Sequence, residues 1–355
     1  MKKNLSKGQY PVSAGTLTWS CPSNIALVKY WGKRPVQLPK NPSLSLTLKK
    51  ALSLTSIDYE YAPSTTEGKI SFIFEGQEQA SFHTRVSEYI TSLYPLQPWL
   101  RNTRMFITSK NTFPHSAGIA SSASAMGALA ACLVDMEERI TGTRAEDPVR
   151  KASYLARLGS GSASRSLYPG FALWGRAELW PESSDEYAIP LSGVHETFLG
   201  MQDSILIVEP GKKKISSSAG HALMETHPYA PERYKQASRN ISKLSRILKK
   251  GSWKGFIDLI EEEALALHAL MLSSKPGYIL MLPGTLELIR KIRAFRLETD
   301  LHLGFTLDAG PNVHLLYDRK HKNRIQAFIQ SDLIQHCNNQ QVIHDEMGAG
   351  PAIQV

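Results

Sequence analysis

The chain has 355 residues, of which 42% are hydrophobic, 21% charged and 8% aromatic. This length and balance exclude a disulfide-stapled mini-protein, a collagen-like chain and a wholly disordered one, and they suit two domains that each bury a core. The formal net charge of +9 favours an anionic partner. Charge alone does not separate nucleic acid, a membrane surface and a small phosphorylated compound.

The three cysteines lie far apart in the sequence, at Cys21, Cys132 and Cys337. Their spacing predicts neither a disulfide framework nor a cysteine zinc site, and it suits a reducing cytoplasm. The basic first residues lead into no apolar stretch, and the long uncharged run 111–134 contains proline and several polar residues. We therefore expect no signal peptide and no membrane-spanning segment.

Patterns typical of β-strands dominate the N-terminal half. Apolar and β-branched residues predict strands at 17–21, 44–61, 69–74, 77–82, 105–109 and 170–180. We interpret 69–82 as a hairpin that turns at Glu75-Gly76. Helical spacing, with Pro148 in the first turn of the last segment, predicts helices at 87–94, 122–140 and 147–158.

A loop rich in proline, serine and acidic residues, 181–196, separates the two halves. We predict a domain boundary there, with domains 1–190 and 191–355. Beyond it, the patterns predict a strand at 205–209, helices at 216–226, 231–250, 252–271 and 285–298, and last strands at 303–308 and 313–317. Because both halves mix strand hairpins with helices, the predicted fold class is α+β and not a doubly wound parallel sheet.

The segment 114–123, PHSAGIASSA, runs from the end of a predicted strand into a predicted helix. The backbone N–H groups of such a small-residue loop can face an anion, and serine hydroxyls can add donors or magnesium ligands. The segment lacks the Walker A lysine and the dinucleotide-binding glycine spacing. Taken alone, it fits a phosphate-binding loop and an ordinary serine-capped helix equally well.

A second small-residue loop, 159–166, reads GSGSASRS and carries four hydroxyl groups beside the guanidinium of Arg165. Arginine suits planar, bidentate contact with a carboxylate or a phosphate. In isolation the loop also fits a flexible glycine-serine linker. Two such loops in one chain favour a phosphorylated ligand.

The segment 24–34, NIALVKYWGKR, places Lys29 and Lys33 four residues apart, on one face if the segment is helical. Together with Tyr30 they could hold an anionic tail, although a solvated basic face explains the two lysines as well. Asp308 ends a predicted strand just before a tight turn, where an acidic residue is usually a cap.

The basic run 212–214 precedes a serine-rich stretch, 216–220, and fits either a surface loop or a further anion site. The 11 histidines are scattered, without an HExxH motif or a close His/Asp cluster, so we expect no transition-metal site. His268, within EEEALALHAL, is interpreted as a packed helix residue.

Taken in chain order, these segments resemble the diphosphomevalonate decarboxylases, a branch of the GHMP kinase superfamily. The matching segments are NIALVKYWGKR, NPSLSLTL, FPHSAGIASSASA, GSGSASRSLYPGFALW, KKKISSSAG and FTLDAGPN, between residues 24 and 312. The resemblance implies two α+β domains with a cleft between them, and ATP and magnesium as cofactors. It also implies conversion of (R)-5-diphosphomevalonate to isopentenyl diphosphate, ADP, phosphate and carbon dioxide.

The resemblance further implies roles for single residues. Asp308 is similar to the family's catalytic acid, Arg165 to the partner of the substrate carboxylate, and Asn24 to the residue that orients this arginine. Lys29 is similar to the lysine beside the aspartate. The residues similar to those that hold the substrate diphosphate are Tyr30, Lys33, Ser160, Ser162 and Ser217. The ATP phosphate loop corresponds to Gly118, Ile119, Ala120, Ser121 and Ser122, and Ser122 is the candidate magnesium ligand.

The sequence also departs from the family pattern at several positions, which are Pro35, Pro42, Ser164, Ser218 and His221. None of these removes a residue with an implied catalytic role. However, Pro42, Ser218 and His221 lie where the substrate tail could bind, and His221 stands where the family commonly has methionine. A monophosphate substrate therefore stays open beside the diphosphate.

Two other functions stay open at this point. A related GHMP enzyme acting on mevalonate or 5-phosphomevalonate would share the phosphate loop, but a simple kinase needs no Arg165 beside DAGPN. A nucleic-acid-binding module is suggested by the net charge and the basic run 318–322, yet no recognition helix or aromatic-basic motif accompanies them. We therefore expect ATP and a small phosphorylated substrate as partners, neither nucleic acid nor membrane, and a homodimer in the cytoplasm.

Overall fold

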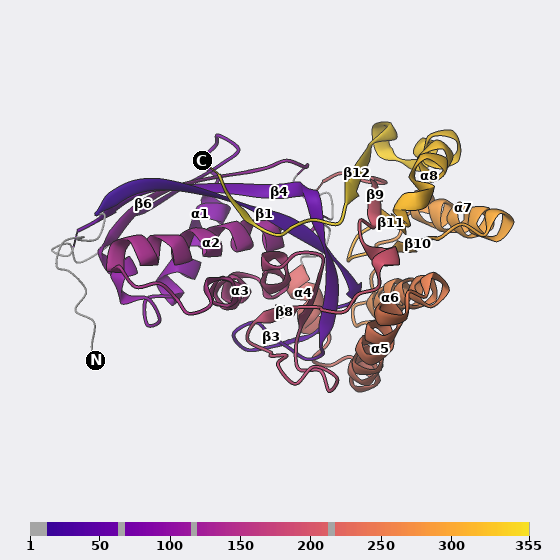
Figure 1. The fold of residues 1–355 in the computed structure, drawn as a ribbon, viewed down its shortest axis with the longest axis horizontal. Helices are drawn as coiled ribbons and strands as arrows, with labels where there is room; N and C mark the ends of the chain where they lie inside the picture. The colour runs from indigo at the N-terminus through magenta and orange to yellow at the C-terminus, as the bar shows by residue number, and fades with distance from the viewer. Residues whose placement is uncertain (1–12, 63–67, 115–118, 212–216, 355) are drawn as a thin grey trace.

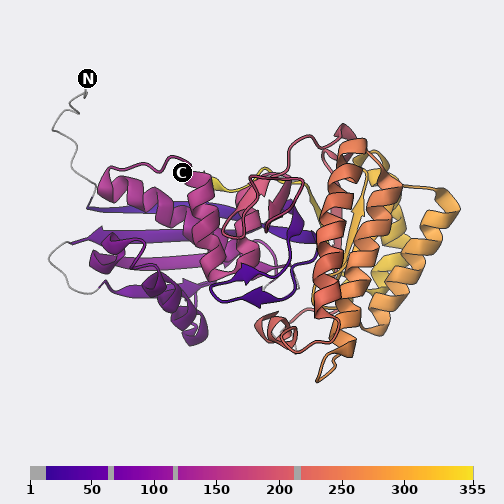
Figure 2. The same ribbon diagram turned by 90° about the horizontal axis from the view of Figure 1, so that it is seen from below.

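The computed structural model describes residues 13–62, 68–114, 119–211 and 217–354, except for the side chains of 217 and 218. Within these residues the chain forms a larger and a smaller β-sheet, each packed against its own helices, at opposite ends of an elongated molecule (Figure 1, Figure 2). This arrangement confirms the predicted α+β class. Among the described helices, none combines the length and apolar character that crossing a bilayer requires.

The larger sheet has seven strands, in the order β13-β1-β4-β6-β5, with β7 on β4 and β8 on β7. All its pairs are antiparallel except β5 with β6. The strands are β1 (Ala14–Val28), β4 (Ser43–Tyr61), β5 (Ile70–Phe74), β6 (Thr103–Asn111), β7 (Phe171–Trp174), β8 (Ala188–Pro190) and β13 (Ala352–Gln354). Helices α1 (Ala80–Ser92), α2 (Ser121–Thr141) and α3 (Pro148–Gly159) cover one face (Figure 1).

The smaller sheet is antiparallel, in the order β10-β11-β9-β12. Its strands are β9 (Gln202–Leu206), β10 (Leu303–Thr306), β11 (Val313–Tyr317) and β12 (Val342–Glu346). The helices of this part are α4 (Ser217–Leu223), α5 (Ala230–Lys250), α6 (Trp253–Ser273), α7 (Pro283–Thr299) and α8 (Lys322–Phe328). A short hairpin joins β2 (Lys33–Arg34) to β3 (Leu38–Pro39).

Several short turns of helix connect these elements. The 3-10 helices are η1 (Pro98–Asn102), η2 (Gly161–Leu167), η3 (Glu196–Phe198), η4 (Arg319–His321), η6 (Ile334–His336) and η7 (Asn338–Gln340), and η5 (Ile329–Leu333) is a π-helical turn. The sequence predicted a loop at 159–166, and the structure folds most of it into η2, whose residues are largely buried.

The hairpin predicted at 69–82 and the prediction that 313–317 is the last strand were wrong, and of the strand predicted at 170–180 only β7 forms. The hairpin at 69–82 is absent: β5 ends at Phe74 and helix α1 begins at Ala80, because Val86, Tyr89 and Ile90 bury one helical face. The strands predicted last in the chain are followed by β12 and β13. Strand β13 is short and exposed, so its pairing with distant β1 leaves little local pattern in the sequence.

The molecule has two parts, one built on the larger sheet and one on the smaller sheet. The ends of β1 and β4 pack against both parts. Apolar side chains from these strands, among them Leu27 and Leu46, share one core with Ile205 of β9 and with α5 and α6. The predicted boundary at 190/191 falls between the end of β8 and the start of β9, and β13 returns across it to the larger sheet. The boundary itself stays a prediction.

One buried carboxylate closes a gap in this junction. The β1–β4 ladder is interrupted between Thr47 and Leu52. Asp345 of β12, which is 2% exposed, accepts hydrogen bonds from the three backbone N–H groups of 49, 50 and 51 at 2.8–3.0 Å. A buried N–H without an acceptor is costly, so Asp345 stabilises the crossing of β4 between the two parts.

We predict that Asp345→Asn destabilises the protein by about 2–4 kcal/mol, since the amide loses the charge and turns a donor toward backbone donors. Equilibrium urea unfolding measures the change, with Asp258→Asn on the exposed face of α6 as the control. Equal stability of the two variants would contradict this role for Asp345.

Candidate active site

An ion pair joins the two parts of the molecule. Lys29 follows β1 and is 1% exposed, and its Nζ lies 3.0 Å from Oδ1 of Asp308, which follows β10. The ammonium also donates to the carbonyl of Ala26 at 2.6 Å. Burial lowers the pKa of Lys29, and the neighbouring carboxylates of Asp308 and Glu263 oppose that shift. Asp308 keeps 27% of its side chain exposed, so its carboxylate can meet a ligand.

Helix α6 holds the backbone on both sides of this pair. Glu263 accepts from the N–H of Lys29 at 2.9 Å, and Nε2 of His268 lies 3.1 Å from the carbonyl oxygen of Asp308. Because a carbonyl only accepts, Nε2 of His268 carries the proton. Burial lowers the pKa of His268 to about 4, so the ring is neutral near pH 7. His268 is thus packed, as predicted, and it also contacts the acid-bearing turn.

Glu263 is fully buried and its charge is compensated. Arg233 of α5 donates to both carboxylate oxygens, and Asn240 adds a donor at 2.6 Å. The sequence analysis missed Glu263 and Arg233. Both lie in helices whose charged residues mostly face solvent, so no local pattern separated them from surface residues.

Arg165 lies buried in η2, close enough to Asp308 to be attracted by it. Its Nε and Nη1 donate to the hydroxyls of Ser45 and Ser43 on β4, and its guanidinium packs over the ring of Trp174. Burial lowers the pKa of Arg165 to about 10, so the group keeps its charge near neutral pH. Ser43 and Ser45 are two residues apart in β4 and therefore lie on the same face of the strand. The sequence analysis did not use this spacing.

The expected pairing of Asn24 with Arg165 takes a different form. Asn24 Nδ2 donates to Ser166 Oγ at 2.8 Å and to the carbonyl of Ser162 at 3.2 Å. Asn24 therefore fixes the loop on either side of Arg165, while Ser43 and Ser45 are the hydrogen-bond partners of the guanidinium. Asn24 Oδ1 is buried without a partner among the described residues.

The first small-residue loop ends at the N-terminus of α2. Ala120 adopts a left-handed conformation, with φ of 46°, and Ser121 begins the helix with a buried hydroxyl that lacks a partner among the described residues. Ile119 is buried, and its carbonyl accepts from the hydroxyl of Ser23. Gly118 lies outside the described residues. The backbone N–H groups at a helix N-terminus suit phosphate oxygens.

The two small-residue loops meet. Ser122 Oγ at the start of α2 lies 3.5 Å from Ser160 Oγ, next to η2. An added Cβ on Gly161 would lie 3.0 Å from the Tyr30 hydroxyl, so only glycine lets these groups approach so closely. That hydroxyl is buried without a partner within the described part of the chain.

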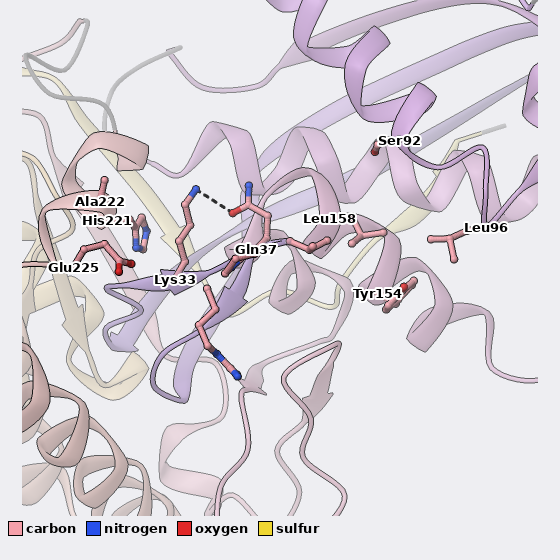
Figure 3. Close-up of a pocket in the computed structure, with 12 residues that line it drawn as sticks. Lys33, Gln37, Ser92, Leu96, Tyr154, Leu158, His221, Ala222 and Glu225 are labelled. Carbon is pink, nitrogen blue, oxygen red and sulfur yellow. Dashed lines mark hydrogen bonds between the residues drawn. The ribbon is translucent and has the colours of Figure 1, made fainter.

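The segment 24–34 is extended and turned, so the helical face considered for Lys29 and Lys33 does not exist. Lys29 points to Asp308, whereas Lys33 on β2 lines a pocket of about 640 Å³. Lys33 Nζ donates to Gln37 at 3.3 Å (Figure 3). Burial and the nearby Arg85 lower the pKa of Lys33. Ser217 begins α4, its side chain lies outside the described part, and Ser162 is half-buried in η2.

Within the described residues, one cluster away from this site has the donor types of a metal site. His302, Asp318 and His321 place ligand atoms within 4.8 Å of one another, which the sequence analysis did not expect. The carboxylate already accepts from the backbone of Lys320 at 3.0 Å, and Arg319 lies beside it in the chain. Asp318 thus caps the turn η4, and the cluster is interpreted as a capped turn.

Comparison with known proteins agrees with this geometry. A family model described as "Diphosphomevalonate decarboxylase-like N-terminal domain" matches residues 21–188, and "Mevalonate 5-diphosphate decarboxylase C-terminal domain" matches 204–353. The diphosphomevalonate decarboxylase of Ganoderma lucidum is 30% identical, over 88% of this chain and 80% of its own length. That of Homo sapiens is also 30% identical, over 85% and 76%.

Solved structures show the same likeness. Mevalonate diphosphate decarboxylase from Staphylococcus aureus superposes with a TM-score of 0.82 at 28% identity, and the match covers 96% of this chain and 98% of that one. The enzyme from Enterococcus faecalis gives a TM-score of 0.78 at 26% identity, with coverage of 96% and 98%. From both domain models and these relatives, the chain belongs to the diphosphomevalonate decarboxylase family.

Proposed function

We infer that the chain converts (R)-5-diphosphomevalonate and ATP to isopentenyl diphosphate, ADP, phosphate and carbon dioxide. The grouping of Asp308, Lys29 and Arg165 across the junction of the two parts is the observation that carries this inference. Family membership supports it, as does a solved relative, "MDDEF", 27% identical with a TM-score of 0.79, that binds MVAPP, AMPPCP and magnesium.

ATP supplies the phosphoryl group that turns the tertiary C3 hydroxyl into a leaving group, and magnesium shields the charge of its phosphates. The residues suited to hold the phosphates are 119–122, with the N–H groups of the α2 start and the Ser121 hydroxyl, which has no partner among the described residues. Ser122 is exposed beside Ser160 and is our candidate magnesium ligand.

Asp308 is proposed to take the proton of the C3 hydroxyl as the oxygen bonds to phosphorus. A carboxylate is a weak base for an alcohol, but the hydroxyl becomes acidic late in a loose phosphoryl-transfer transition state, so position matters more than basicity. Lys29 fixes Oδ1 of Asp308 at 3.0 Å, and α6 fixes the backbone of both residues.

Arg165 is proposed to hold the substrate carboxylate. Once phosphate leaves C3, the C–C bond to the carboxylate breaks, its electron pair forms the alkene, and carbon dioxide departs. Since Arg165 is already held by Ser43 and Ser45, its fork is oriented before the substrate binds. A kinase without decarboxylation would have no carboxylate to expel, and this buried guanidinium therefore favours the decarboxylase over the kinase alternative.

A cytoplasmic location and a homodimer stay part of this proposal. The three cysteines are all buried and unpaired, which supports a reducing compartment. Light scattering of the purified protein would test the dimer.

We predict that Asp308→Asn lowers kcat by at least about 1,000-fold, because the isosteric amide cannot take a proton. The variant should keep its fold and its ATP affinity, with lower stability because the buried Lys29 loses its counter-charge. Coupled measurement of ADP and carbon dioxide, with equilibrium binding of ATP, checks both parts. Near wild-type kcat would remove Asp308 from the mechanism.

Arg165→Lys keeps a cation but loses the planar fork that Ser43 and Ser45 orient. We expect kcat/KM for diphosphomevalonate to fall by about 10- to 100-fold. Arg150→Lys, on the exposed start of α3, is the control and should match wild type. A fully active Arg165→Lys enzyme would exclude bidentate binding of the carboxylate.

The pocket lined by Lys33 and Gln37, which we call the tail pocket, predicts a preference for the 5-diphosphate over the 5-monophosphate. Losing one or two charge-assisted hydrogen bonds should lower kcat/KM by about tenfold to a hundredfold. Steady-state rates with both substrates under the same Mg-ATP decide the point. Equal values, or a preference for the monophosphate, would show a differently built pocket.

A further inference from the structure

His221 of α4 lies buried against the turn that follows β1. Its ring packs against Tyr30 and Trp31, with ring centroids 4.3 and 4.7 Å away, and its Nδ1 accepts a hydrogen bond from the backbone N–H of Gly32 at 2.9 Å. The ring is 7% exposed. The three residues from Tyr30 to Gly32 are therefore contacted from one side by a single imidazole.

The hydrogen bond from Gly32 fixes where the ring carries its proton. A backbone amide only donates, so Nδ1 must be unprotonated, and a neutral ring then has its hydrogen on Nε2. Burial, with a smaller contribution from Lys33, lowers the pKa of His221 to about 3. Near neutral pH the ring is thus an uncharged N–H donor at Nε2.

His221 and Lys33 line the same pocket. His221, Lys33 and Gln37 lie along the same cavity (Figure 3). The other charged side chains of the lining have opposite-charge partners: Arg34 pairs with Asp185 at 2.6 Å, and Glu225 pairs with Lys40 at 3.0 Å. Lys33 instead donates to the neutral amide of Gln37. The pocket therefore presents a cation and a neutral N–H donor to the same space, which suits a phosphate group.

We propose that His221 is a substrate-binding residue whose Nε2–H donates to a tail phosphate oxygen beside Lys33, while its Nδ1 holds the Gly32 amide. The proposal rests on the inferred function, since it assigns a contact to the diphosphate of that substrate. One ring then has two separable tasks, a structural one at Nδ1 and a ligand contact at Nε2.

Two variants separate the tasks. In His221→Asn, the side-chain oxygen can replace Nδ1 as acceptor for Gly32, but nothing replaces the Nε2 donor. In His221→Gln, the amide nitrogen can reach the place of Nε2, whereas the acceptor near Gly32 is lost. We expect His221→Asn to raise the KM for diphosphomevalonate about tenfold or more, with the KM for ATP unchanged, and His221→Gln to stay within about threefold of wild type.

His227 provides matched controls. It is a buried histidine whose Nδ1 also accepts from a backbone N–H, that of Tyr229, and whose Nε2 lies 3.0 Å from the carbonyl of Leu270. Both of its ring nitrogens face protein groups, so His227→Asn and His227→Gln should leave the KM for diphosphomevalonate unchanged. An equal rise in both His221 variants, or a larger rise in His221→Gln, would overturn the proposal in favour of a purely structural role.

Binding of inorganic diphosphate, measured by calorimetry, separates this proposal from the inferred function. If wild type releases carbon dioxide but His221→Asn binds diphosphate as tightly as wild type, the proposal fails and the function stands. If wild type is inactive but His221→Asn alone binds diphosphate at least about tenfold more weakly, the contact stands and the function fails. Should a variant not fold, NMR of the wild-type protein tests the contact. The ring N–H resonance of His221 should shift when inorganic diphosphate is added, and an unchanged resonance would overturn the proposal.

Discussion

The ion pair of Lys29 and Asp308 constrains how the two sheets are placed relative to each other. Removing a lysine ammonium from water costs several kcal/mol unless a counter-charge and further acceptors lie in good geometry. Those acceptors are the Asp308 carboxylate and the carbonyl of Ala26. Since Lys29 extends from the larger sheet and Asp308 from the smaller, the pair forms only when the two sheets meet in one orientation.

Helix α6 helps to hold Lys29 and Asp308 in this arrangement because it contacts the backbone of both residues. A backbone contact fixes where a side chain starts and leaves its charged end available, so Glu263 and His268 can set the position of the pair without neutralising it. Glu263 in turn needs the guanidinium of Arg233, for a fully buried carboxylate without a partner would be protonated or displaced. Two long helices, α5 and α6, therefore set the backbone positions of the ion pair.

The sequence predicted what short-range chemistry controls. The long helices follow from apolar spacing, and the two small-residue loops follow from glycine and serine content, so Arg165 and the α2 start were identifiable. Contacts between residues far apart in the sequence were not predictable in this way. Lys29 and Asp308 are separated by 279 positions, and Glu263 has the spacing of a solvated helix residue. The segment 24–34 was considered as a helix because spacing alone does not reveal the antiparallel partner, β4, that makes its first part a strand.

The turn from Lys29 to Lys33 lies between the proposed catalytic acid and the pocket proposed for the substrate tail. Its first lysine points to Asp308, its last lysine lines the tail pocket, and Gly32 between them is tied to His221. With the proposed roles of Asp308 and Lys33, the substrate spans this turn, and its tail contacts would determine how far the C3 hydroxyl lies from the Asp308 carboxylate. Phosphoryl transfer is sensitive to such distances, because misplacement by about 1 Å costs on the order of a hundredfold in rate. On these proposed roles, binding energy at the tail orients C3 for reaction, and a shortened tail should lower kcat as well as raise KM.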